Sequence, residues 1–171
     1  MAASSAPEVW LRGPLPSYAP VLMPVAHALL QAREDVERVA TEATAEELWR
    51  RPGGAASAGY HLQHLGGSLD RLFTYARGEP LNERQRAALL QEGTPGAAGS
   101  ELALAVLAQI DQVLEQLRHT AVESLGSARE VGRARLPSTV LGLLFHAAEH
   151  TSRRVGQLIT TMKIVRGLVS A

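Results

Sequence analysis

Four long stretches of the chain repeat apolar residues every three or four positions, and this repeat is the strongest constraint on the fold. The stretches cover residues 19–40, 57–78, 100–117 and 138–167. Such spacing places apolar side chains on one face of an α-helix. No segment shows the sustained alternation, or the hairpin turn between β-branched runs, that is typical of paired strands. The sequence therefore predicts an all-α protein, most economically a four-helix bundle.

Helix-capping and helix-breaking residues mark the ends of these stretches. Thr44 and Glu47 have capping-box spacing and predict a short helical turn, and Ser57 can cap the second long helix. Gly78 is a natural end for that helix. The sequence Leu136-Pro137-Ser138 predicts the start of the fourth long helix, with proline near its first turn.

The connection between the second and third long helices is unusually long for a helical bundle. It covers residues 79–98, about twenty residues, and contains a short helical piece. A connection of this length can cross the bundle. We therefore expect a four-helix bundle with a long crossover between helices 2 and 3, which would let these two helices run parallel.

The length of 171 residues suits one domain with a real hydrophobic core. Residues 1–16 are small and proline-containing, and we expect them to form a flexible N-terminal arm. Residues 17–171 are expected to form a single bundle domain.

Composition excludes several classes of function. The 17 basic and 17 acidic residues give no net charge, which argues against binding to nucleic acid. The chain has no cysteine, so thiolate catalysis and thiolate metal sites are excluded. Neither a signal peptide nor an apolar run long enough to span a membrane is evident. We therefore expect a cytoplasmic protein with no membrane partner.

Histidines supply the clearest chemical signal. Four of the six form two pairs: His61 and His64 are three residues apart, and His146 and His150 are four apart. Either spacing places two imidazoles on one side of a helix, one turn apart, as two ligands of one metal ion require. Bundle cores build metal sites from facing helices. The alternative is a set of packed histidines that bond to one another.

A helical wheel of the fourth helix shows where the second pair lies. At 100° per residue one stripe of this helix is polar and the opposite side is apolar. The polar stripe consists of Thr139, His146, His150, Arg153 and Gln157. A polar stripe in an otherwise apolar helix usually lines a cleft.

Two segments carry a family resemblance. The stretches SAGYHLQHLGGSLDRLFTYARGEPL and LLFHAAEHTSRRVGQLITT resemble the DinB/YfiT-like superfamily, and the similarity runs from about Tyr18 to Lys163. Its most specific elements are His64-Leu65 and the segment from His150 to Gly156-Gln157.

The resemblance implies a four-helix bundle that holds one divalent metal, often Zn, Ni or Fe, through three side chains. One ligand would come from the second helix and two from the fourth. Members of this superfamily include S-transferases and a maleylpyruvate isomerase that use low-molecular-weight thiols, and dimers are common. A small-molecule substrate, a thiol cofactor and a homodimer are therefore the corresponding expectations for this chain.

Carried over by position, His64 and His150 match two of the family's ligands. The departure is Arg154, where many relatives have a histidine; arginine stays protonated and cannot donate a lone pair to a metal. His146 is then the best candidate for the third ligand and His61 the next. Otherwise the site is degenerate and empty.

Two functional hypotheses follow from these residues. In the first, three imidazoles leave a coordination position open, as in a catalytic metal site, and Arg153 and Arg154 pair with a carboxylate on the thiol or substrate. Gln157 would either orient one of the ligands through a hydrogen bond or only satisfy a polar contact. In the second, the two arginines only complement the helix C-terminus, and the protein is a non-catalytic helical module for dimerisation or ligand binding.

Overall fold

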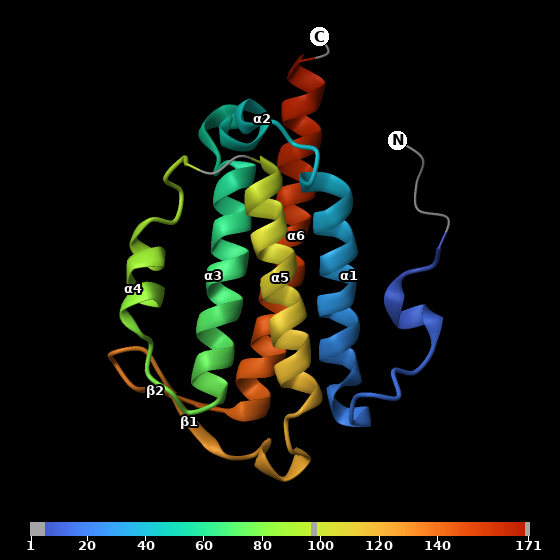
Figure 1. Ribbon diagram of the computed structural model, residues 1–171, viewed down its shortest axis with the longest axis vertical. Helices are drawn as coiled ribbons and strands as arrows, with labels where there is room; N and C mark the ends of the chain where they lie inside the picture. The colour runs from blue at the N-terminus through green and yellow to red at the C-terminus, as the bar shows by residue number, and fades with distance from the viewer. Residues whose placement is uncertain (1–5, 97–98, 170–171) are drawn as a thin grey trace.

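Residues 6–96 and 99–169 are described by a computed structural model, and they fold into helices with one short β-hairpin (Figure 1). The helices are η1 (Val9–Arg12), η2 (Pro20–Leu22), α1 (Met23–Ala40), α2 (Ala45–Trp49), η3 (Pro52–Gly54), α3 (Ala58–Ala76), α4 (Glu83–Leu90), α5 (Gly99–Arg118), η4 (Val122–Ser124) and α6 (Val140–Val169). The strands are β1 (Ala128–Val131) and β2 (Leu136–Thr139).

The four long helices lie side by side around one hydrophobic core. Helix α3 packs against α5 and α6, and α1 packs against the same two helices. Figure 1 shows α3 and α5 starting at the same end of the molecule, with α4 beside α3 on the way back. All four contribute to the largest fully buried side chains, among them Phe73, Leu29, Leu65, Leu69, Ile110, Leu117, Leu158 and Met162.

The predicted caps are present. The side chain of Thr44 accepts a hydrogen bond from the Glu47 amide at 3.2 Å, and Glu47 accepts one from the Thr44 amide at 2.9 Å. Ser57 accepts from the Tyr60 amide at 3.2 Å and caps α3. Gly78 follows α3 with φ of +80°, a backbone conformation that disfavours any side chain.

The prediction for residues 128–139 was wrong. These residues form an antiparallel hairpin in which Val131 pairs with Leu136, although neither a strand nor a hairpin turn was expected. Each strand has only four residues and none of them is buried, so neither shows the sustained alternation of apolar and polar residues that marks a half-buried strand. Helix α6 begins at Val140, where Thr139 accepts a hydrogen bond from the Gly142 amide at 3.0 Å.

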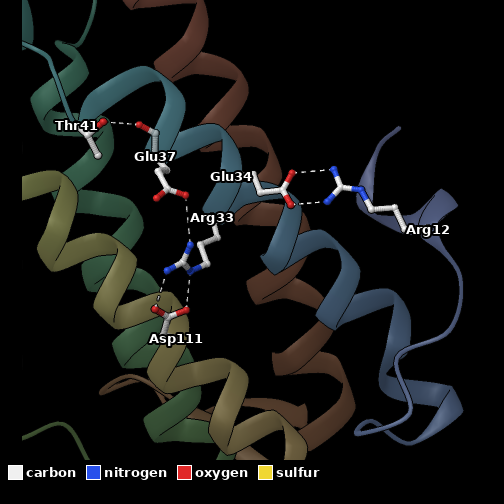
Figure 2. Close-up of polar contacts among 6 residues, drawn as sticks. All are labelled: Arg12, Arg33, Glu34, Glu37, Thr41 and Asp111. Atoms are coloured by element: carbon white, nitrogen blue, oxygen red, sulfur yellow. Dashed lines mark hydrogen bonds and ion pairs between the residues drawn. The ribbon is translucent and has the colours of Figure 1, made fainter. Parts of the chain in front are cut away.

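The described part of the N-terminal arm returns along α1. Val9 is buried, and the Arg12 guanidinium forms two hydrogen bonds with the Glu34 carboxylate, at 2.5 and 2.9 Å (Figure 2). These bonds hold the pKa of Glu34 below its usual value, against a smaller opposing effect of burial. The first five residues of the expected arm lie outside the described residues, and the flexibility of the arm remains a prediction.

Ion pairs also join the long helices across the surface. Arg33 of α1 contacts Asp111 of α5 at 2.7 and 3.2 Å (Figure 2). Such exposed pairs contribute roughly 0–1 kcal/mol each, so the buried core supplies most of the stability. Over the described part of the chain, we find no helix with the length and apolar character needed to cross a membrane.

Candidate functional site

Helices α3 and α6 bring His64 and His150 into direct contact. The two Nε2 atoms are 3.0 Å apart, although the residues are separated by 86 positions in sequence. The ring centroids are 5.1 Å apart, with the rings inclined at 61°. A contact between two imidazole nitrogens requires that one of them carries the shared proton.

A buried carboxylate orients His64 from its other side. The Nδ1 atom of His64 lies 2.6 Å from Oε2 of Glu92, and Arg71 donates to Oε1 of the same carboxylate at 2.8 Å. Burial alone would raise the pKa of Glu92, but the hydrogen bonds from His64 and Arg71 hold it below its usual value. Since Glu92 fixes the Nδ1 atom, Nε2 of His64 points to His150.

His150 is held in its neutral form. Burial, followed by the charges of His64 and Arg154, lowers the pKa of His150 to about 4. At neutral pH its ring therefore carries a lone pair.

Arg154 occupies the space beside that lone pair. Its Nε lies 3.4 Å from Nε2 of His150, and its Nη1 donates to Oε1 of Gln157 at 2.9 Å. Arg154 thus contacts His150 through Nε and Gln157 through Nη1. Arg153 instead pairs with Glu149 at 2.8 Å, and its Nη2 lies 3.5 Å from Nδ1 of His150.

His146 lies beside His150, but its Nδ1 atom faces the carboxylate of Glu149. Its Nδ1 is 2.8 Å from Oε1 of Glu149, and its ring centroid is 5.5 Å from that of His150. It is half-exposed, and the contacts found for its ring within the described residues are with Glu149 and His150 rather than with His64.

His61 is buried on α3, one turn before His64. Its Nδ1 atom has no hydrogen-bond partner among the described residues. Its pKa is lowered by burial first and then by the nearby charges of Arg154 and His64. The four predicted histidines thus lie in one region, but only His64 and His150 meet nitrogen to nitrogen.

The residues present do not fit a three-ligand metal site in this arrangement. Within residues 6–96 and 99–169, no group of three or more histidine or acidic side chains is placed to hold a metal ion. The Nε2 atoms of His64 and His150 provide two donors, and a catalytic Zn site requires three. The guanidinium of Arg154, a permanent cation that cannot donate a lone pair, lies 3.4 Å from the Nε2 donor of His150.

Sequence reasoning missed Glu92, Arg71 and Tyr60. Tyr60 stacks on the His64 ring with centroids 5.6 Å apart and planes 11° from parallel. Glu92 lies 28 positions after His64, in the long connection, where an acidic residue next to glycine looks like an ordinary loop residue. No local pattern pointed to it, because only the packing of that connection against α3 brings it to the histidine.

Neither His64 nor His150 lines any of three prominent clefts in the described residues. Glu92, which bonds to His64, lines the smallest of these clefts, about 350 Å³ in volume.

Comparison with known proteins gives the family. The model of the DinB superfamily matches residues 28–158, more than half of the chain. The chain belongs to the DinB superfamily. The match includes both histidines of the pair, Glu92 and Arg154.

Among solved structures, the chain is similar to a conserved protein from Enterococcus faecalis. The two share 18% identity with a TM-score of 0.71, over 87% of this chain and 99% of the other. At this identity the likeness concerns the fold alone. The comparison with curated proteins gave no match.

Proposed function

We propose that this DinB-superfamily protein is a helical ligand-binding module in which the family's metal site is degenerate. In this proposal the His64–His150 pair and Arg154 form a polar centre for a small anionic molecule. The observation that carries the proposal is the Arg154 guanidinium, whose Nε lies 3.4 Å from the His150 lone pair that a metal would need.

Charge supports an anion at this centre. Arg154 brings a permanent positive charge, and His150 is neutral at physiological pH because burial and its cationic neighbours lower its pKa. Guanidinium groups bind carboxylates through short, charge-assisted hydrogen bonds. Arg153 is less suited to this role, because Glu149 already pairs with it.

The alternative function is a divalent-metal-dependent transferase or isomerase that uses a low-molecular-weight thiol. One observation favours it: a carboxylate on the Nδ1 of a histidine is a common support for a metal-binding Nε2, and Glu92 stands in this relation to His64. His146 or His61 would then have to turn to supply a third donor. The homodimer and the thiol, like the cytoplasmic location, remain predictions.

Metal analysis of protein purified without a His-tag separates the two functions. We expect far less than one divalent ion per chain and little change in melting temperature on addition of Zn²⁺ or Ni²⁺. The substitution Arg154→His should create a third imidazole one turn after His150. If this variant binds Zn²⁺ tightly, saturating Zn²⁺ should raise its melting temperature by about 5–10 °C.

The double variant Arg154→His, His150→Ala is the matched control and should lose this gain. About one bound ion per wild-type chain, lost in both His64→Ala and His150→Ala, would overturn the ligand-binding proposal in favour of the metal-dependent alternative.

A further inference from the structure

The largest of the three clefts lies far from the histidine pair. It has a volume of about 930 Å³ and is formed by the β-hairpin, α4 and the C-terminal end of α3. Figure 1 shows the hairpin tip beside the loop that leads into α4. Tyr75, which lines it, follows His64 by eleven residues, a distance of roughly 16 Å along the helix. Its volume lies within the range of small-molecule sites.

One side of this cleft is apolar and open to solvent. Tyr75, Pro80 and Leu81 form part of the wall, and Leu89 and Leu90 of α4 complete it. Leu89 is 45% exposed and Leu90 is 82% exposed, so two adjacent leucines face water at the rim. Covering them with an apolar ligand would remove this surface from water, which is favourable.

The lining of the cleft also carries an excess of positive charge. Its lining has four arginines and two glutamates. Both glutamates are already paired, Glu130 with Arg135 and Glu79 with Arg77. The remaining arginines are Arg86, Arg129 and Arg133, and among the described residues none of them has a carboxylate within ion-pairing distance.

Two of these arginines are held in place by the backbone. Arg129 donates through Nε to the Ala76 carbonyl and through Nη1 to the Ala128 carbonyl, both at 2.8 Å. Arg86 donates to the Leu81 carbonyl. These bonds fix the positions of the guanidinium groups without neutralising their charge, and arginine has five N–H donors in all.

We propose that this cleft binds a small amphipathic carboxylate. Its apolar chain or ring would pack on Tyr75 and the exposed leucines, and its carboxylate would pair with Arg129 and Arg133. The occupant follows from charge complementarity, because an apolar wall next to three guanidinium groups that lack acidic partners suits a molecule with one apolar and one anionic end.

The test is a titration of the full-length protein with three probes, monitored by calorimetry and by amide shifts in NMR spectra. Decanoate has both features, decylamine has the same chain with the opposite charge, and acetate has the charge alone. We expect decanoate to bind below its micelle concentration, and the other two to bind at least about tenfold more weakly. The amide shifts should centre on residues 78–90 and 128–135.

Variants locate the site. Arg133 lies in an exposed turn, so Arg133→Gln should leave the fold intact while it weakens decanoate binding about tenfold. Leu90→Gln should weaken it as well. Arg50→Gln, at an exposed arginine outside the cleft, is the matched control and should bind like the wild type.

Equal binding of decylamine and decanoate, an unchanged affinity in Arg133→Gln, or amide shifts centred on His64 and His150 would each overturn the proposal. So would binding to anionic vesicles without binding to free decanoate, because the occupant would then be a membrane surface.

Discussion

Arg154 differs from histidine in one property that decides the chemistry of the site, because its charge is permanent. A histidine at this position would present a lone pair to a metal, whereas the guanidinium presents N–H donors to His150. Burial first, then the charge of His64 and then that of Arg154 lower the pKa of His150 to about 4, so the same guanidinium adds to the effects that keep this ring neutral. One residue thus removes a metal donor and favours the neutral form of its neighbour.

This lowered pKa predicts a pH dependence of stability. His150 titrates near 6.5 when unfolded and near 4 when folded, so the unfolded chain takes up a proton first as the pH falls. We expect the free energy of unfolding to drop by about 1–2 kcal/mol between pH 7 and pH 5, a figure that allows for partial solvent exposure.

Urea unfolding at the two pH values measures this drop. The variant His150→Gln should show a smaller drop than the wild type, and the remainder should come from His61, whose pKa is lowered in the same direction. An identical drop in both proteins would contradict the assignment to His150.

The two spacings placed four histidines on two helices, and the family pattern singled out His64 and His150 as ligands of one metal ion, a role that stays a prediction. The direct contact between these two rings is visible only in the structure. The sequence was not sufficient to find Glu92, because a loop carboxylate acquires its partner only when the loop packs. The relation of Arg154 to His150 followed from helix spacing, but the distance between their nitrogen atoms depends on side-chain positions that spacing does not determine.

At the scale of elements, periodicity predicted the long helices because each has a buried face. It failed for β1 and β2, whose four-residue strands bury little and gain their pairing from a turn that contains Gly132, with φ of +69°. It also failed for one residue of α6. Phe145 is an apolar residue in the first turns of this helix, yet it is 65% exposed.

The packing of α2 on α3 depends on the absence of a side chain at Gly59. A Cβ atom there would lie 2.7 Å from Cζ3 of the Trp49 ring, closer than atoms pack. Gly59→Ala should therefore displace the ring and cost about 1–3 kcal/mol of stability. Thermal melting checks this result.

Gly156→Ala is the matched control in another helix, where a Cβ atom would meet nothing within 4 Å. It should be neutral or stabilising by up to about 1 kcal/mol, because alanine favours a helix over glycine. Equal destabilisation by the two changes would show that contact with Trp49 is not the cause.

At the scale of the whole molecule, one core shared by the long helices makes unfolding a cooperative event. Phe73 lies in that core with 1% of its surface exposed. Phe73→Ala should therefore cost about 3–5 kcal/mol and lower the melting temperature as a single transition. Calorimetry measures both quantities.

Phe145→Ala removes the same atoms from an exposed position and should change stability by less than about 0.5 kcal/mol. A loss as large as that of Phe73→Ala would mean that Phe145 is covered in solution, for example by a second copy of the chain.

The connection from α3 to α5 is attached to α3 partway along its length. Gln63 accepts a hydrogen bond from the Gly93 amide at 2.6 Å and donates to the Thr94 carbonyl at 3.1 Å, next to the bond between Glu92 and His64. This attachment divides the connection between α3 and α5 into two shorter segments, which should differ in how well they tolerate inserted residues. Extra residues at the exposed positions 79–80, ahead of α4, would lengthen a surface loop at a small entropic cost. Extra residues at positions 92–94 would move the carboxylate that orients His64, so a change in loop length alone would disturb the histidine pair.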